Sequence, residues 1–197
     1  MSSKILVDEI APKTTGGAVK GASNVLEMIP MLCDGESYTG ISGTYTTSDV
    51  TAVQNLTSSY ADITGSSISY TPPTGAVAVV YEYHVFMSYV DQYGLAHVKF
   101  MIDGTWASDQ RRTIGHNAYY EDIVNLRFVI PIGGTADSAT GRQASWTSAK
   151  TLKLQMREYG SSNEMKLNRT ISWDGATSAN TVKPSLTITA IGSAYNG

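Results

Sequence analysis

The chain has 197 residues, which is room for one sizeable domain or two small ones, and its formal net charge is −3. Charged residues make up 16% of the chain, against about 25% in an average protein. The acidic balance and the lack of a Lys/Arg block exclude a nucleic-acid-binding module. No apolar run reaches the roughly 18 residues of a membrane helix, so we expect no membrane insertion.

Hydroxyl groups rather than charges make this chain polar, since it contains 22 Ser and 22 Thr. Apolar residues still make up 42% of the sequence, and there are 12 Tyr. A disordered chain lacks this apolar content. The combination of Ser, Thr, Gly and Tyr with few charges favours β-structure.

The sequence contains no motif of a common catalytic or metal site. It lacks His-Glu-x-x-His, a Walker loop, Gly-x-Gly-x-x-Gly and Gly-x-Ser-x-Gly. Cys33 is the only cysteine, so an internal disulfide and a cysteine-rich zinc site are excluded. We therefore expect no enzymatic activity, no cofactor and no metal ion. Two alternatives remain. One is a hydrolase whose catalytic triad leaves no local motif, and the other is a metal ion held by three copies of one histidine on a symmetry axis.

The first 35 residues form a leader that cannot bury enough surface to fold alone. Its start is apolar, with Ile5, Leu6, Val7 and Ile10, and it is then broken by Pro12 and by two glycines. The apolar start is too short for a secretory signal, so we expect synthesis in a cytosol. We interpret residues 1–35 as an extended attachment arm whose start suits strand addition to a neighbouring chain. The alternative is a frayed terminus.

From about residue 44 onwards, apolar residues alternate with polar ones at a period of two, which is typical of strands with one buried face. The alternation predicts the buried residues Tyr81, Tyr83, Val85, Met87, Tyr89, Leu152, Leu154, Met156, Met165, Leu167, Ile171, Trp173, Leu186 and Ile188. Residues 126–132 are more evenly apolar and are expected to be buried on both faces, with Pro131 at a strand end or bulge.

Turn signals separate these predicted strands. Asp103-Gly104 and Asp174-Gly175 are hairpin signals, and residues 72–75 and 133–134 mark further bends. About eight strands result and no convincing helix, with 121–126 the only weak exception. We predict an all-β fold, an antiparallel β-sandwich or jelly roll at residues 36–197, preceded by the extended arm 1–35.

Aromatic residues in predicted loops are candidates for contact with a receptor or glycan. Exposed Tyr and Trp stack on sugar rings and anchor protein interfaces. The candidates are Trp106, Tyr119, Tyr120 and Trp146. The alternative is that these side chains belong to the core or to a subunit interface.

The opening SSKILVDEIAPKTTGGAV resembles a segment at the start of fibre and other structural proteins of tailed bacteriophages, especially marine and cyanobacterial ones. In those proteins a short apolar-acidic stretch precedes an Ile-x-Pro-Lys/Arg-Thr turn and a glycine. Ala11 departs from the pattern, which more often has a polar residue there. The body is similar to domains of such phages at SSISYTPPTGAVAVVYEYHV, VKFMIDG, TLKLQMREY and LTITAIG.

The resemblance implies a virion protein whose N-terminal arm, through Ile5, Leu6, Val7, Ile10 and Pro12, binds another virion protein. It also implies a β-domain that projects as a homotrimer and brings no catalytic residues. The main hypothesis is a tail fibre or similar appendage that contacts a host-surface glycan or protein. One alternative is a capsid fibre or decoration protein without a receptor. The other is a non-viral glycan-binding β-sandwich.

Overall fold

The structure is a computed structural model that describes residues 25–89, 93–117, 121–160, 164–170 and 180–192. Within these ranges the chain forms β-strands and a single short 3-10 helix, η1 (Ser108–Gln110). The strands are β1 (Val25–Leu32), β2 (Ser37–Thr39), β3 (Thr44–Thr46), β4 (Gln54–Asn55), β5 (Ala61–Asp62), β6 (Ile68–Tyr70), β7 (Ala76–Tyr89), β8 (Tyr93–Ile102), β9 (Thr105–Trp106), β10 (Arg112–Asn117), β11 (Glu121–Pro131), β12 (Lys150–Glu158), β13 (Met165–Leu167), β14 (Arg169–Thr170), β15 (Asn180–Thr181) and β16 (Ser185–Gly192).

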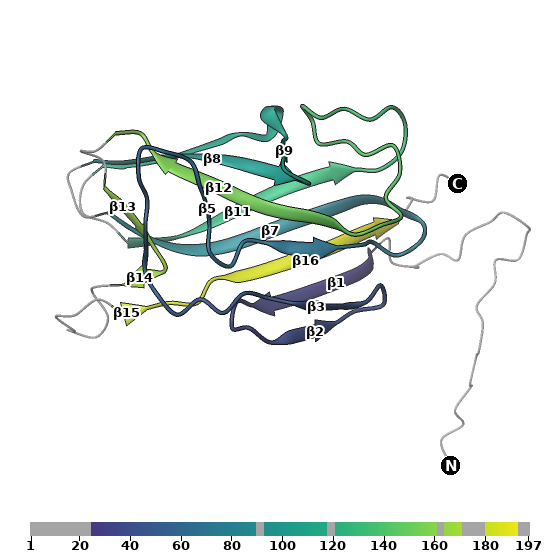
Figure 1. The fold of residues 1–197 in the computed structure, drawn as a ribbon, viewed down its shortest axis with the longest axis horizontal. Helices are drawn as coiled ribbons and strands as arrows, with labels where there is room; N and C mark the ends of the chain where they lie inside the picture. The colour runs from purple at the N-terminus through teal and green to yellow at the C-terminus, as the bar shows by residue number, and fades with distance from the viewer. Residues whose placement is uncertain (1–24, 90–92, 118–120, 161–163, 171–179, 193–197) are drawn as a thin grey trace, which may run out of the picture.

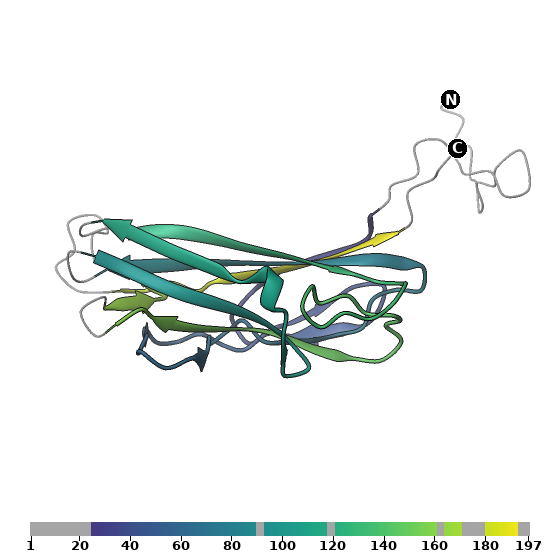
Figure 2. The same cartoon turned by 90° about the horizontal axis from the view of Figure 1, so that it is seen from above.

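Two antiparallel sheets form the layers of a β-sandwich, which confirms the predicted fold class (Figures 1 and 2). The first, here the β7 sheet, has the order β1-β16-β7-β13-β4, and β11 pairs with the other edge of β7. The second, here the β8 sheet, has the order β10-β8-β12-β5, with β6 on β12 and β9 on β8. Two small ribbons, β2–β3 and β14–β15, complete the described part.

The core between the sheets comes from the inward positions that the alternation predicts. Every predicted core residue within the described ranges is buried, whereas Ile171 and Trp173 lie outside those ranges. Aromatic rings join the two layers, since Phe100 of β8 stacks on Phe128 of β11 at 4.6 Å between centroids and packs on Tyr81 of β7 at 5.2 Å. Such contacts add about 0.5–1.5 kcal/mol each beyond the burial of area.

Two predictions about individual strands need correction. Residues 126–132 are not buried on both faces, because Leu126, Phe128 and Ile130 point into the core while Arg127 and Val129 lie on the surface. Pro131 ends β11, as predicted. The weak helical signal at 121–126 is the start of the same strand, whose pairing with β7 overrides local propensity.

The predicted boundary after residue 35 is also corrected, because residues 25–32 are a full strand of the β7 sheet. β1 pairs with β16 from Val25 to Leu32 and buries Ile29 and Met31. The edge of β1 away from β16 is protected: Leu32 donates its N–H to the Tyr38 hydroxyl at 3.1 Å, and Pro30, which faces the same edge, has no N–H. The arm therefore comprises at most residues 1–24, and its candidate residues Ile5, Leu6, Val7, Ile10 and Pro12 lie outside the described residues.

Turn chemistry follows the sequence signals. Asp103 and Gly104 have φ values of 48° and 78°, as a two-residue hairpin between β8 and β9 requires. Bends occur at Gly75 and at Gly133-Gly134, all with positive φ. The Asp174-Gly175 signal lies outside the described residues.

A buried carboxylate ties the β2–β3 hairpin to β1. Glu27 points inward from β1 and is 5% exposed. It accepts hydrogen bonds from the backbone N–H of Ser42 at 2.8 Å, from the Ser42 hydroxyl and from the Tyr70 hydroxyl at 2.8 Å. The carboxylate is therefore satisfied by residues far away in the sequence, which no local pattern reveals.

In the described part of the chain, no helix is long and apolar enough to cross a membrane.

Candidate functional surfaces

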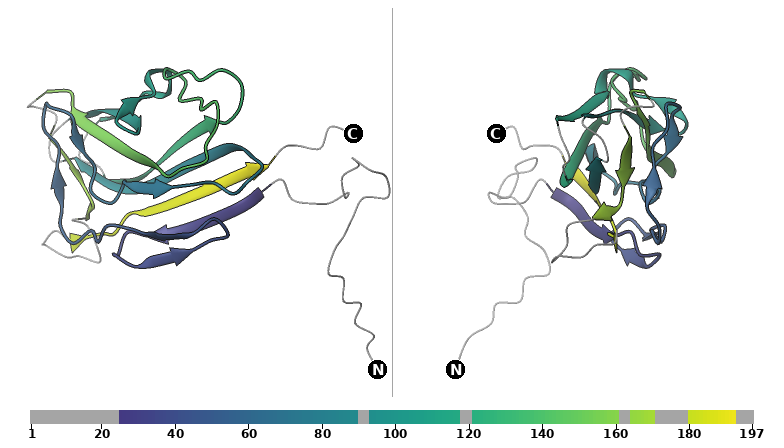
Figure 3. Two further views of the ribbon diagram at one scale, coloured as in Figure 1. Left: turned by 45° about the vertical axis from the view of Figure 1, so that its right-hand side comes forward. Right: turned by 90° about the vertical axis from the view of Figure 1, so that its left-hand side faces the viewer.

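The folded body has two distinct ends. β1 begins and β16 finishes at the same end, where Val25 pairs with Ile191, and Gly192 lies opposite Ala76, the first residue of β7 (Figure 3). The chain thus enters and leaves the body at one place, which we call the entry end. Any segment that precedes residue 25 joins the sandwich there.

Residues that border the connections at 90–92, 118–120 and 171–179 lie at the far end, opposite the entry end. Asn117 of β10 pairs with Tyr93 of β8, and Glu121 of β11 pairs with Ser88 near the end of β7. At the same end Met165 pairs with Tyr89, and the Thr170 hydroxyl donates to Glu121 at 3.1 Å. The predicted contact residues Tyr119 and Tyr120 lie outside the described residues, between Asn117 and Glu121.

The outer face of the β7 sheet, which points away from the core, is rich in exposed apolar side chains. Met28 of β1 and Ile123 of β11 are 60% and 62% exposed. Strand register places Met28, Thr189, Val80 and Val129 in one row across the sheet. The exposed large apolar residues of this face are Val25, Met28, Leu32, Ile123 and Val129. A face of this kind is typical of a surface that another chain covers.

The outer face of the β8 sheet is different, because it gathers cations and aromatic rings. Lys99 of β8 holds its Nζ 3.8 Å from the ring centroid of Tyr60 and 4.7 Å from that of Trp106. Arg157 of β12 lies 5.5 Å from the same Tyr60 ring. Tyr159 is well exposed and packs edge-on against His97 at 5.9 Å. Trp106, predicted as a contact residue, is therefore part of a larger cluster, here the cation–aromatic face.

Sequence reasoning missed most of this cluster. The alternation did place Lys153, Gln155 and Arg157 opposite the buried residues of β12. Tyr60, however, reaches the face from the segment between β4 and β5, far from Lys99 in sequence. The pairing of β5 with β12, and the hydrogen bond from the Glu158 N–H to the Thr57 carbonyl at 2.9 Å, bring that segment to the face.

Trp146 is corrected as a contact candidate, because its side chain belongs to the core. It is 6% exposed, and its indole N–H donates to the backbone carbonyl of Tyr70 at 3.1 Å. The two rings pack edge to face with 6.1 Å between centroids. This is the alternative that the sequence left open for the loop aromatics.

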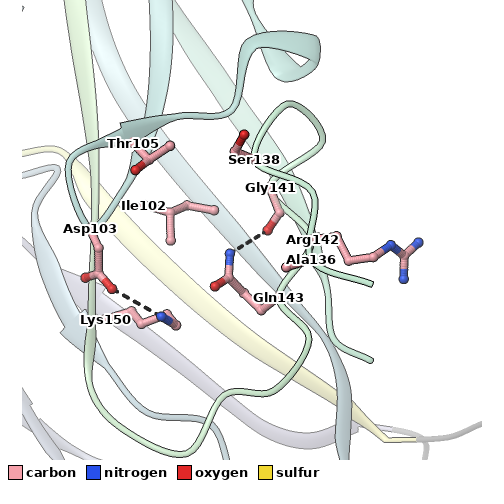
Figure 4. A pocket seen from close by; sticks show the side chains of 9 residues that line it. All are labelled: Ile102, Asp103, Thr105, Ala136, Ser138, Gly141, Arg142, Gln143 and Lys150. Atoms are coloured by element: carbon pink, nitrogen blue, oxygen red, sulfur yellow. Dashed lines mark hydrogen bonds and ion pairs between the residues drawn. The ribbon is translucent and has the colours of Figure 1, made fainter. Parts of the chain in front are cut away.

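A small polar pocket lies beside the β8–β9 hairpin, at the entry half of the β8 sheet (Figure 4). Its cavity volume is about 240 Å³. Inside it Lys150 and Asp103 form an ion pair at 3.2 Å, and Asp103 also accepts the N–H of Thr151 at 2.8 Å. Gln143 donates to the carbonyl of Gly141 at 2.9 Å, whereas the guanidinium of Arg142 points away. The Asp103–Lys150 ion pair and the Gln143 hydrogen bond thus satisfy the main polar side chains of the pocket within the chain itself.

No cluster of three or more His, Cys, Asp and Glu side chains capable of holding a metal occurs among the described residues.

Cys33 and Glu158 are two buried side chains with a raised pKa. Cys33 is fully buried, its thiol donates to the carbonyl of Gly65 at 3.3 Å, and burial raises the pKa of the thiol to about 12. Burial likewise raises the pKa of the Glu158 carboxyl, where the nearby Glu164 acts in the same direction. Glu158 faces inward from the end of β12, away from Lys99 and Arg157.

No protein-family model matches the chain, and no curated protein matches it in sequence. Among solved structures it is similar to infectious bursal disease virus, Gx strain, with 12% identity and a TM-score of 0.37 over 86% of this chain and 37% of that chain. It is also similar to the VP2 subviral particle of infectious bursal disease virus, with 14% identity and a TM-score of 0.36 over 96% and 42% of the two chains. The chain thus spans less than half the length of these two. At this level of similarity, function has to be argued from the chain's own residues.

Proposed function

We propose that this chain is a structural protein of a virion: a homotrimeric tail fibre, or similar appendage, of a tailed bacteriophage. It is synthesised in the host cytoplasm, and it uses no cofactor and catalyses no reaction. Residues 1–24 bind another virion protein, and the β-sandwich contacts a glycan or protein of the host surface. The phage-like segment at residues 4–16 supports the origin.

The observation that carries this proposal is that the sandwich has two different ends, the entry end and the far end. The arm joins the body at the entry end, beside Val25 and Ile191. The connections around residues 90–92 and 118–120 are bordered by residues of the far end. A body fixed through its arm therefore turns its far end, where the described Asn117 and Glu121 lie, away from the particle, which is the arrangement a host-contacting appendage needs.

The outer face of the β7 sheet supports self-association. Its exposed apolar side chains lie on both edges of the sheet, at Met28 and Leu32 on β1 and at Ile123 and Val129 on β11. Covering this face removes apolar surface from water, which stabilises the association by about 25 cal/mol for each Å² of apolar area buried. Three copies around an axis would cover it in each chain and leave the cation–aromatic face free.

Deleting residues 2–20 tests the attachment arm. The deletion leaves β1 intact, so we expect a folded protein with the solution mass of a trimer, three times that of the shortened chain. We expect this protein to be missing from phage particles assembled around it, as measured by mass spectrometry of purified virions. Normal incorporation of the deleted protein would rule out the arm. A copy number set by the whole shell rather than by the tail would favour a decoration protein instead.

Val129→Lys tests the trimer. A charge on the β11 edge of the apolar face should be buried on association, so we expect the mass of a single chain by light scattering. Ile41→Lys is the matched control, because Ile41 is 81% exposed and lies in the β2–β3 turn, away from this face. A wild-type chain that is already monomeric, or a control that dissociates equally, would contradict the proposed interface.

A further inference from the structure

We propose that the cation–aromatic face of the β8 sheet binds an anionic polysaccharide, laid along the strands. The face consists of Tyr60, His97, Lys99, Trp106, Arg157 and Tyr159. The inference deepens the host contact of the proposed function and rests on it for the biological source of the polysaccharide. Binding itself is a property of the purified chain.

The first argument is that two of its positive charges have no anionic partner. Among the described residues, neither Lys99 nor Arg157 forms an ion pair with a carboxylate, whereas Lys153 pairs with Asp62 at 2.7 Å. Within the described ranges Arg157 donates to the backbone carbonyls of Glu158 and Tyr159, at 3.2 and 3.3 Å. The chain as a whole has a net charge of −3, so this positive face stands out against its surroundings.

The aromatic rings hold the ammonium group in place. The Nζ of Lys99 lies between the rings of Tyr60 and Trp106, at 3.8 and 4.7 Å from their centroids. A cation held this way is attracted to the ring faces by about 0.5–2 kcal/mol per contact. It therefore needs little further ordering when an anion arrives, which lowers the entropic cost of binding.

The geometry of the face suits a polymer rather than a small molecule. Register places His97 opposite Arg157, Lys99 opposite Gln155 and Met101 opposite Lys153, in successive rows along β8 and β12. At about 3.3 Å per residue these rows extend the face over roughly 13 Å. The pockets beside Ile102, Arg127 and Trp146 are lined by other residues than those of this face. An extended chain with sugar faces for the rings and repeated anionic groups for the cations matches this surface.

An acidic polysaccharide is favoured over a nucleic acid, the other polyanion with stacking groups. Nucleic-acid binding surfaces carry many phosphate-neutralising cations, and this face offers two uncompensated ones. A polysaccharide with one carboxylate or phosphate per repeat needs only a few cations of this kind along its length. The amphipathic rings of Tyr60 and Tyr159 also suit the apolar faces of sugars.

The test uses the purified full-length chain and alginate, a polymer of uronic acids, in a calorimetric or biolayer binding assay. Dextran is the neutral control and duplex DNA the competing polyanion. We expect alginate to bind, binding to weaken with added salt, and neither dextran nor DNA to bind comparably. No alginate binding, equal dextran binding or stronger DNA binding would overturn the inference.

Variants locate the site. Lys99→Met with Arg157→Met keeps both aliphatic stems and should weaken alginate binding by about tenfold or more. Arg142→Met with Lys183→Met removes the same net charge from other surfaces and should bind as the wild type does. Equal losses in the two double variants would show a general charge effect and refute the site.

A single substitution at an exposed position tests the site even if the double variant misfolds. Tyr159→Ala removes a ring that is 60% exposed, so the fold is expected to persist while alginate binding falls several-fold. Unchanged binding of this variant would contradict the role of the rings. If alginate fails to bind while the arm deletion behaves as expected, the inference fails and the proposed function stands. If alginate binds but the deleted protein still enters particles, the reverse holds.

Discussion

Replacing Glu27 by Gln perturbs the contact that ties the β2–β3 hairpin to the sandwich. The carboxylate accepts hydrogen bonds from three donors, which are the Ser42 N–H, the Ser42 hydroxyl and the Tyr70 hydroxyl. An amide offers one acceptor oxygen and an NH2 group, so at least one buried donor loses its partner. Hydrogen bonds to a charged group contribute about 1.5–3 kcal/mol each, so we expect a loss of roughly 2–4 kcal/mol.

The same substitution predicts how stability depends on pH. Burial alone would raise the pKa of Glu27, but the hydrogen bonds from Ser42, Tyr70 and Ile41 more than offset it and lower the pKa below its usual 4.5. A carboxyl with a lowered folded-state pKa stabilises the fold above its unfolded pKa, and this contribution is lost as the pH falls through the folded value. The difference between wild type and Glu27→Gln should therefore be full at neutral pH and shrink below 4.5.

Urea unfolding from neutral to acidic pH measures this difference. Asp62→Asn is the matched control, since the hydrogen bond from Lys153 and then that from Gln155 also lower the pKa of Asp62, yet its side chain is 55% exposed. Solvent screening should limit the cost of that variant to about 0.5 kcal/mol. A Glu27→Gln variant that loses no more than this, or whose loss is independent of pH, would refute the reasoning.

Three further predictions concern single buried or edge positions. Cys33, with its pKa raised to about 12 by burial and by Asp34, should resist iodoacetamide in the folded protein and react only in urea, as mass spectrometry can measure. Gly94→Ala would place a Cβ 1.6 Å from Cδ1 of the buried Tyr89, so the urea midpoint should fall by the equivalent of about 2 kcal/mol or more, and an unchanged midpoint would contradict this packing. Gln110 pairs through its amide with the N–H and carbonyl of Val129 on the edge of β11, so Gln110→Ala should melt earlier and scatter more light on heating.

The sequence predicts the sandwich well because its strands have one buried face. Along β7 and β12 the period-two alternation identifies most of the inward side chains, although it misses Val79 and Glu158. The same rule fails for β1, where an inward Glu27 and a central Pro30 hide the strand. The reason is physical: the partners of Glu27 are Ser42 and Tyr70, 15 and 43 residues away, and a local pattern does not show that a charge is satisfied.

Candidate site residues are harder to predict, because exposure depends on contacts between distant segments. Trp146 looks like a loop aromatic, but a carbonyl 76 residues away accepts its indole proton and the ring is buried. Trp106 has a similar local sequence setting and remains partly exposed beside Lys99. Nothing in the local sequence separates the two tryptophans, since the difference arises from which face of the β8 sheet each ring meets: Trp146 packs on Tyr70 in the core, whereas Trp106 lies beside Lys99 on the outer face.

The two outer faces of the sandwich differ in what they can bind, and the difference follows from their side chains. Exposed apolar residues such as Met28 and Val129 gain most by leaving water, so the β7 face suits a permanent contact between copies. Lys99 and Arg157 would lose hydration on full burial, so the β8 face suits an open contact that an anion can reach and leave. Because the sheets are opposite layers of one sandwich, the proposed trimer, joined through the first face, would turn three copies of the second outward. Weak binding at each copy would then become strong binding to a polymer that spans them, through effective concentration alone.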